Sequence, residues 1–438
     1  MRSILKMTSR TIRSFFGRYL ALLLIVALSV SFFAGLKVTK DAMYATAQDY
    51  LEAQNFCDFR LLSTLGFTDD DVDALRREGY IGKAEGVRST DVLIPYEDGN
   101  KAFKILSITD QVNIPSLVSG RMPQTKTECL ADARAFDESD IGRVVTLSSD
   151  NDPDTLDMLN TQSFLIVGLA NSPLYISTDR GTTTIGDGAL KGFLFLHPDA
   201  FDLEVYTEVD VCLRRSAAIY SDAYDSLMET YKPEITKRVY ELAWDQYDNY
   251  LDLLGLDREN AKYVDLEEPE TYVLTRRENA GFVSFQNDTA IVSAVANLLP
   301  VFFIMIALLV CITTMTRMVS EERTQIGVLK AMGFHSWDIA AKYLLYALSA
   351  TLLGWLLGYF LGTWGLPEVF WRAYGVLYKF APLKYTYSRS LAMITLGVSL
   401  VGILGATLAS CWRSLRSVPA ELIRPQRGKS GKRILLEY

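Results

Sequence analysis

The chain of 438 residues has few of the residues from which catalytic and metal centres are usually built. Its two histidines, His197 and His335, lie far apart in the sequence, which leaves little material for a histidine metal site or a Ser-His-Asp triad. The five cysteines include no Cys-x-x-Cys pair. A phosphate loop is also missing, because Ile423 stands where the first glycine ahead of Gly428-Lys429-Ser430 is required. These absences predict that the chain is not an enzyme and binds no metal or cofactor.

Charge is missing altogether from four long stretches, which are residues 19–36, 289–316, 343–367 and 390–412. Because a charge inside a bilayer is costly, apolar runs of about 20 residues predict membrane-spanning helices. Lys37 follows the first run instead of a small-residue cleavage site, so we expect a retained helix and not a signal peptide. The layout is one span, a large insert, and then three spans.

The expected fold is an α+β membrane protein with four transmembrane helices and a large extracytoplasmic α+β domain inserted after the first. The predicted division is an N-terminus with helix 1 (1–36), the insert (37–288), a permease domain with helices 2–4 (289–425), and a basic tail (426–438). Within the insert, Thr68 is expected to cap a helix that ends near Glu78. Strands are predicted at 56–63, 87–96, 102–108, 144–147, 164–169, 192–196 and 206–213, and helices at 221–231 and 233–254.

Charged residues are distributed unevenly along the chain. Residues 2–18 hold five basic residues and no acid, whereas the insert is strongly acidic, which argues against a nucleic-acid partner. By the positive-inside rule, both termini are predicted to be cytoplasmic in the plasma membrane, and the insert lies outside. One loop disagrees, because the segment between the last two spans carries Arg372, Lys379, Lys384 and Arg389.

Gly354, Gly358 and Gly362 fall four residues apart in the third span, and Gly402, Ala406 and Ser410 form a weaker stripe in the last. Such stripes let another helix backbone approach closely. They can form a seam between two chains or pack inside one bundle, and the sequence does not separate these alternatives.

The segment 317–342, between the second and third spans, predicts an amphipathic helix that is ended by Gly333, with Ser336 capping the next helix. A connection between two spans needs only a few residues. The segment is therefore either a surface for a partner or an interfacial helix anchored by Phe334 and Trp337.

The pattern Arg323, Gln325-Ile326-Gly327, Leu329-Lys330-Ala331 and Gly333 resembles the FtsX-like permeases of ABC transporters, a family that includes the MacB type. The one-plus-three layout, residues 416–425, and Gly120-Arg121-Met122-Pro123 with Glu128 are also similar to the family. The resemblance implies that the segment is a coupling helix seated on a separate cytoplasmic ABC ATPase. The residues implied to face that ATPase are Arg323, Gln325, Ile326, Gly327, Leu329, Lys330 and Gly333.

The resemblance further implies that two permease bundles pair, as a homodimer or a heterodimer, and that ATP-driven movement works the external domain. Gln325 departs from the family, because many relatives have glutamate there. Some relatives are longer and carry a second bundle, so this chain is expected either to need a second permease or to be half of a two-bundle protein.

The function expected from these observations is that of a permease subunit that exports or extracts a lipid, a lipoprotein or an amphipathic peptide, with membrane lipid among its partners. The alternative is a membrane-anchored sensor or scaffold that regulates an extracytoplasmic partner such as a cell-wall hydrolase.

Overall fold

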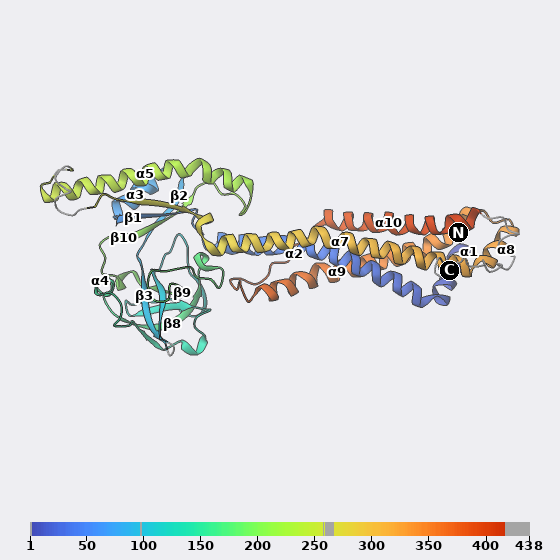
Figure 1. Cartoon of the computed structure of the whole chain (residues 1–438), viewed down its shortest axis with the longest axis horizontal. Helices are drawn as coiled ribbons and strands as arrows, with labels where there is room; N and C mark the ends of the chain where they lie inside the picture. Colours follow the sequence, from blue (N-terminus) through green and yellow to red (C-terminus); the bar gives the residue numbers. More distant parts are fainter. Residues whose placement is uncertain (1, 97–98, 257, 259–266, 417–438) are drawn as a thin grey trace, which may run out of the picture. The chain divides into compact units, whose positions relative to one another are not determined.

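The computed structural model describes residues 2–96, 99–256, 258 and 267–416. The chain forms two compact units. The bundle unit comprises Met1–Ala42, Ala290–Trp371 and Tyr385–Tyr438, and the insert unit comprises Met43–Thr289 and Arg372–Lys384. The predicted α+β class is confirmed, and four helices are long and apolar enough to cross a membrane (Figure 1).

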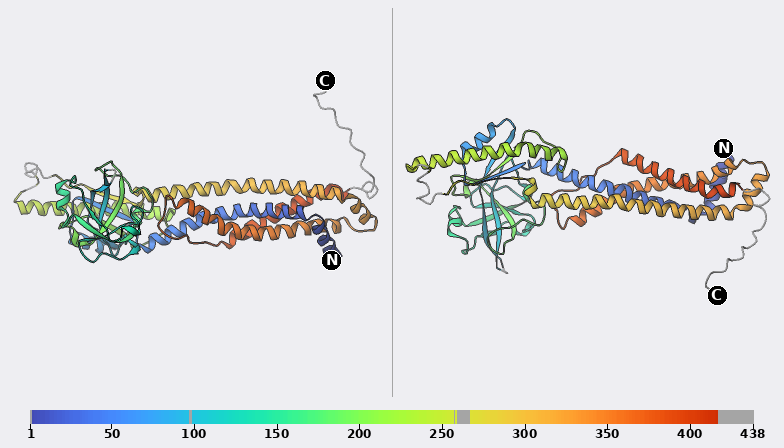
Figure 2. Two further views of the ribbon diagram at one scale, coloured as in Figure 1. Left: turned by 90° about the horizontal axis from the view of Figure 1, so that it is seen from below. Right: turned by 45° about the horizontal axis from the view of Figure 1, so that its top comes forward.

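The four candidate spans are α2 (Phe16–Ala53), α7 (Ala280–Glu321), α9 (Ser336–Tyr374) and α10 (Arg389–Arg416). Each contains one of the four charge-free runs, as the sequence predicts. In the bundle unit these helices run side by side (Figures 1 and 2), together with the short helices α1 (Arg2–Ser14) and α8 (Arg323–Ala331).

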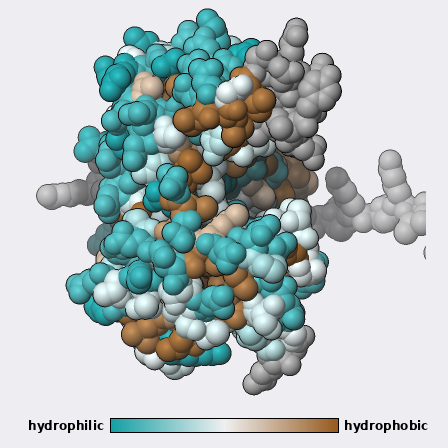
Figure 3. Space-filling view, turned by 90° about the vertical axis from the view of Figure 1, so that its left-hand side faces the viewer, coloured by the Kyte–Doolittle hydropathy of each residue, from teal (hydrophilic) through white to brown (hydrophobic). Residues whose placement is uncertain are grey.

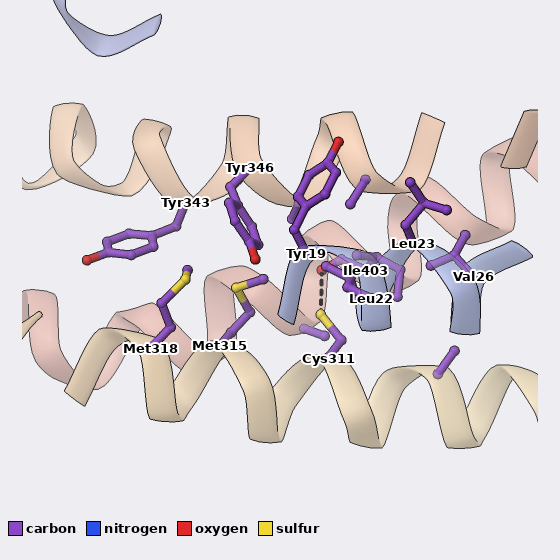
Figure 4. Close-up of a cluster of buried hydrophobic side chains, with 14 of the residues drawn as sticks. Tyr19, Leu22, Leu23, Val26, Cys311, Met315, Met318, Tyr343, Tyr346 and Ile403 are labelled. Carbon is purple, nitrogen blue, oxygen red and sulfur yellow. Dashed lines mark hydrogen bonds between the residues drawn. The ribbon is translucent and has the colours of Figure 1, made fainter. Parts of the chain in front are cut away.

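The core of the bundle is built from side chains of all four long helices (Figure 4). Tyr19 of α2 and Tyr346 of α9 meet edge to face, with ring centroids 5.3 Å apart. Met315 of α7 is fully buried beside them. The thiol of Cys311 in α7 donates to the carbonyl of Ile403 in α10 at 3.7 Å, which joins two helices through a polar contact inside the apolar core.

In the insert unit, a four-stranded antiparallel sheet, sheet A, has the strand order β11-β1-β10-β2. Its strands are β1 (Phe59–Phe67), β2 (Ile81–Val87), β10 (Tyr206–Leu213) and β11 (Thr271–Thr275). Helices α3 (Asp69–Arg77) and α5 (Asp222–Leu254) contribute to the hydrophobic core on one face of this sheet. Thr68 and Asp71 form a capping box at the start of α3, so the predicted cap is confirmed.

A seven-stranded mixed sheet, sheet B, has the order β3-β4-β9-β6-β8-β5, with β7 paired to β8. The pairs β4–β9 and β6–β8 are parallel, whereas β3–β4 is the antiparallel pair that the sequence predicts. The strands are β3 (Ser89–Tyr96), β4 (Gly99–Ser107), β5 (Ser116–Gly120), β6 (Glu128–Asp132), β7 (Val144–Thr146), β8 (Ser163–Asn171) and β9 (Leu190–Leu196). Short helices are α4 (Pro153–Asp157), η1 (Glu138–Asp140), η2 (Pro173–Tyr175), η3 (Pro198–Ala200) and η4 (Arg276–Glu278). One face of the insert unit is mostly hydrophilic, with smaller hydrophobic patches (Figure 3).

The structure corrects the predicted helices and strands of the insert. The helices expected at 221–231 and 233–254 are one continuous helix, α5, with Pro233 inside it. Burial of Ile235, Val239 and Leu242 outweighs the single backbone hydrogen bond that a proline cannot donate. Strands β2, β5, β6 and β11 are not among those predicted. All five cysteines are free thiols.

Candidate coupling site at the α7–α9 elbow

Between α7 and α9 the chain turns through α8 in a compact connection, which we call the elbow (residues 322–338). Gly333 follows the end of α8 with φ +93°, a left-handed conformation that glycine adopts without strain. The N–H of Phe334 donates to the carbonyl of Leu329 at 3.1 Å, and the N–H of Gly333 donates to that of Lys330 at 3.0 Å. This pattern closes a Schellman-type end, which confirms the predicted role of Gly333. Helix α9 then begins at Ser336 itself, so the predicted cap lies one residue too far along the chain.

A buried ion pair anchors the elbow to the bundle. The carboxylate of Glu322 accepts hydrogen bonds from Lys342 at 2.7 Å and from the hydroxyl of Tyr343 at 2.6 Å. Glu322 and Lys342 are each only 7% exposed. Because Glu322 directly precedes α8 while its partners belong to α9, displacement of α8 must either break this contact or move α9 as well.

A second ion pair connects the end of α7 to α2. Arg18 donates two hydrogen bonds to Glu321, at 2.7 and 2.9 Å, in the bidentate geometry that gives arginine–carboxylate pairs their directional strength. Arg317 also pairs with Glu321 at 3.1 Å, four residues earlier on α7. The elbow is thus connected through adjacent residues of the chain to three of the four long helices.

The structure separates the seven residues that the resemblance assigns to the ATPase contact. Ile326 is 1% exposed and belongs to the bundle core, and Gly327 is also buried. Leu329 packs against the same core. Gln325 and Gly333 are exposed, whereas Arg323 and Lys330 are half-buried. Ile326 and Gly327 therefore contribute to the packing of the bundle. The exposed residues of the elbow are the ones available to contact another molecule.

Four large apolar side chains of the elbow face outward, and we call them the elbow patch. Their exposed fractions are 45% for Val328, 62% for Met332, 40% for Phe334 and 63% for Trp337. Val328 lies in α8 and Met332 is the residue that caps its C-terminal end. Because they are four residues apart, they lie on the same side of the helix. Grouped exposed apolar side chains mark an interaction surface more often than scattered ones do. Sequence reasoning missed Val328 and Met332, because the resemblance assigned only those positions that match the family pattern, and neither residue is among the seven.

The glycine stripe of α9 is filled by α2 of the same chain. A Cβ atom at Gly358 would lie 2.2 Å from the carbonyl oxygen of Ala27, and one at Gly362 would lie 2.4 Å from that of Ser31. Gly354 approaches the carbonyl of Leu23 in the same way. The alternative that this stripe forms a seam between two chains is therefore corrected, because the close approach that glycine permits occurs inside the bundle.

The weaker stripe of α10 faces α7. A Cβ atom at Gly402 would lie 3.1 Å from the side chain of Leu308, and the hydroxyl of Ser410 donates to the carbonyl of Ile312 at 3.4 Å. Ala406 is buried. Both small-residue stripes therefore hold one bundle together.

The basic connection between the last two spans belongs to the insert unit. The N–H of Thr178 donates to the carbonyl of Leu377 at 2.8 Å, and Arg134 donates to that of Val376 at 2.6 Å. The hydroxyl of Tyr378 donates to Asp288 at 2.7 Å. Lys384 pairs with Asp49 at 2.5 Å, and its N–H donates to Thr46 at 2.9 Å. The predicted division places residues 372–384 with the permease domain, whereas the structure places them with the insert, because their polar groups find partners there.

The Gly120-Arg121-Met122-Pro123 motif closes a loop on sheet B. Arg121 forms a bidentate ion pair with Glu128. The carboxylate of Glu128 also accepts from the N–H of Gln124 at 2.8 Å, and these hydrogen bonds lower the pKa of Glu128 to about 2. Gly120 has φ +83°, and a Cβ atom there would lie 2.4 Å from the carbonyl oxygen of Val167. The motif therefore has a structural function in this chain.

The other face of sheet A carries a buried polar cluster. Arg60 contacts both Glu208 and Asp210, and each of these acids is 1% exposed. Asn113 donates to Asp210 at 2.6 Å. Burial, together with the neighbouring charge of Glu208, raises the pKa of Asp210 to about 7. One guanidinium therefore faces two carboxylates, and the excess negative charge favours uptake of a proton.

Within the described part of the chain, no group of three or more His, Cys, Asp or Glu side chains is placed to hold a metal ion. The elbow remains the region in which buried charge, helix ends and exposed apolar surface occur together. The tail pattern beyond Arg416 and the basic tail 426–438 lie outside the described residues.

Residues 297–418 match the model of the FtsX-like permease C-terminal domain. This part of the chain is similar to FtsX-like permeases. The match contains the elbow, all of α9 and α10, and α7 from residue 297 onward, so the resemblance expected from the sequence pattern is confirmed for this part of the chain. No curated protein matches the chain.

Two solved structures are similar to the chain at low identity. One is the extracellular domain of the noncanonic ABC-type transporter YknZ from Gram-positive bacteria, with 11% identity and a TM-score of 0.28, covering 49% of this chain and 98% of that one. The other is the periplasmic region of MacB from Actinobacillus actinomycetemcomitans, with 10% identity and a TM-score of 0.25, covering 53% of this chain and 95% of that one.

Proposed function

We propose that this chain is an FtsX-like permease, that it is the membrane subunit of an ABC transporter, and that the elbow receives work from a separate cytoplasmic ATPase. The observation that carries the proposal is the elbow patch on a helix fixed to the bundle by the Glu322–Lys342 ion pair. A surface that receives force needs apolar area for docking and stiff connections to what it moves.

In this proposal both termini and the elbow are cytoplasmic, and the insert lies outside. The positive-inside rule supports this orientation at the N-terminus. The packing of residues 372–384 within the insert unit supports it as well, because a connection between the last two spans then lies on the same side as the insert. Of the four basic residues between the last two spans, Lys384 is paired with Asp49 of the insert unit, which offsets one of the charges that oppose the rule.

The proposed domains are residues 1–36, 37–288, 289–425 and 426–438, and residues 372–384 pack with the insert. The transported molecule is proposed to be a lipid, a lipoprotein or an amphipathic peptide, which is exported or extracted by movement of the insert. A second permease bundle, identical or different, completes the transporter. Because the glycine stripes are filled within one bundle, the pairing surface is proposed to use other faces.

The test is ATPase association in the full chain. The permease is affinity-purified from membranes, the ABC ATPase that copurifies is quantified, and Val328→Ser and Met332→Ser are introduced together. We expect the copurified ATPase to fall at least about tenfold, because truncation of two residues that act as central hot spots of an interface costs about 2 kcal/mol or more. The control is Val118→Ser, which changes a valine of similar exposure (54%) on β5 of the insert.

Equal ATPase capture by the elbow variant and the control would contradict the coupling proposal and favour the scaffold alternative. Ile326→Ala is unsuitable for this purpose, because Ile326 lies in the bundle core and its loss changes the fold as well as any contact.

A further inference from the structure

A groove with a volume of about 400 Å³ lies between α1 and α9 inside the bundle unit. It is lined by Thr8, Ser9, Ile12, Arg13, Leu345, Leu348, Ser349 and Leu352. The residues from α9 belong to the charge-free run that starts at Tyr343, so this part of the groove lies beside the hydrocarbon of the bilayer. The groove is therefore apolar along one helix and basic at the edge formed by the other.

Helix α1 packs against the long helices of the bundle. Thr8 and Thr11 are 6% and 5% exposed, and Ile12 and Phe15 pack against the bundle core. The hydroxyl of Thr11 donates to the carbonyl of Met7 at 3.1 Å, so it needs no outside partner. The wall that α1 contributes to the groove is thus a fixed part of the structure.

The cations of α1 lack anionic partners in the described part of the chain. Lys6, Arg10 and Arg13 form no ion pair there, whereas Arg18 is fully engaged by Glu321. The first acidic residue in the sequence is Asp41. Lys6, Arg10 and Arg13 are spaced four and three residues apart, which places them on one face of α1, and Arg13 alone among them lines the groove.

The groove has an apolar wall and, at one end, a guanidinium without an anionic partner among the described residues. This combination complements a molecule with an acyl chain and an anionic head group. We infer that the groove binds an anionic phospholipid from the leaflet on the α1 side, with an acyl chain against Leu345, Leu348 and Leu352 and the phosphate at Arg13. Arginine suits this position because its planar guanidinium bonds phosphate oxygens in pairs. Lys6 and Arg10 add attraction to the surrounding anionic surface without touching the bound lipid.

The experiment measures lipid retained by the full-length protein. The permease is extracted in mild detergent, reconstituted in nanodiscs of phosphatidylglycerol or phosphatidylcholine, and analysed by native mass spectrometry for lipids that remain bound to the chain. We expect phosphatidylglycerol to be retained in preference to phosphatidylcholine. Arg13→Gln is expected to lower that preference about tenfold or more, because it removes charge-assisted hydrogen bonds to the phosphate as well as attraction to the anionic surface.

Two further variants separate the groove from general surface attraction. Leu348→Trp fills the groove without changing charge and is expected to abolish lipid retention. Arg10→Gln removes the same charge from α1 outside the groove and is expected to retain the lipid, with a loss of preference no greater than about fivefold from weaker surface attraction. Thermal midpoints in phosphatidylcholine nanodiscs, compared with the unmodified chain, check that each variant is folded; if Leu348→Trp fails this check, Leu345→Phe replaces it.

Equal losses for Arg13→Gln and Arg10→Gln, with no effect of the folded groove-filling variant, would overturn the inference in favour of surface attraction alone. Retention of phosphatidylcholine equal to that of phosphatidylglycerol would also overturn it, by showing a neutral lipid site. Displacement of the lipid by inorganic phosphate would overturn the role of the acyl chain. None of these outcomes depends on the ATPase, so they leave the proposed function untouched.

Discussion

The bundle unit and the insert unit are packed differently around their buried polar groups. In the bundle, helix backbones meet at glycines, and the principal buried ion pair, Glu322–Lys342, joins the elbow to α9. In the insert, sheet A buries Glu208 and Asp210 beside the half-buried Arg60, on a face opposite its apolar core. A surface that faces lipid gains nothing from a hydrophobic effect between helices, so the bundle relies on close packing. The insert unit has a mostly hydrophilic face and holds charge beside its core, where hydrogen bonds such as that from Asn113 to Asp210 satisfy it.

The largest expected effect comes from breaking the buried pair in the bundle. Lys342→Met leaves the Glu322 carboxylate with the Tyr343 hydroxyl as its remaining side-chain partner. Removal of one member of a buried pair costs about 3–5 kcal/mol, because the other charge stays desolvated. The thermal midpoint of the purified protein measures the loss. The double variant Glu322→Gln, Lys342→Met should recover most of it, and a double variant as unstable as the single one would contradict this account.

The next effect tests the glycine stripe. Gly358→Ala places a methyl group against the carbonyl of Ala27 and should cost about 1–3 kcal/mol through overpacking. Gly365→Ala is the matched control in the same helix, because a Cβ atom there meets nothing within 4 Å. It should be neutral or slightly stabilising, since alanine is the better helix former. Similar thermal midpoints for the two variants would show that α2 and α9 do not need this close approach.

A smaller effect on stability is expected from the polar cluster of the insert unit, and it depends on pH. The folded-state pKa of Asp210 is raised to about 7, so the native state holds this proton more tightly than the unfolded chain does. The resulting stabilisation is complete below the ordinary pKa of 3.8, is lost as pH rises toward 7, and is constant above that. Each pKa unit corresponds to about 1.4 kcal/mol.

Asp210→Asn should therefore flatten the change between pH 5 and pH 7.5 in hydrogen exchange of β10, measured in the full chain. Asp199→Asn, at an acid whose side chain is 79% exposed, is the control and should leave the profile as it is. An unchanged profile in Asp210→Asn would assign the pH dependence to other groups.

The smallest effect is expected at the surface of sheet B. Arg121→Met removes the ion pair with Glu128 but leaves the N–H of Gln124 bonded to that carboxylate. Exposed ion pairs contribute little and are screened by salt, so the thermal midpoint should fall slightly at low salt and hardly at all at high salt. A large loss that salt does not reduce would instead show that the motif carries a contact beyond this pair.

Much of the architecture follows from patterns that lie within a few residues of one another. Charge-free runs give the four candidate spans, because the cost of a charge in a bilayer acts on each helix separately. The Thr68 cap and the Gly333 helix end are local backbone devices, and both are found where expected. By contrast, β6 and β11 are five residues long and take their partners from distant strands, so their own residues carry little signal.

The sequence by itself determined the one-plus-three layout, the family pattern of the elbow, and the presence of small-residue stripes in the last two helices. The tertiary structure alone decided that Ile326 points inward while Val328 and Met332 point outward, that the α9 stripe belongs to α2, and that residues 372–384 join the insert. The physical reason is that periodicity identifies a face of a helix, whereas the partner of that face depends on residues hundreds of positions away. Packing against these distant residues decides which face of each helix is buried.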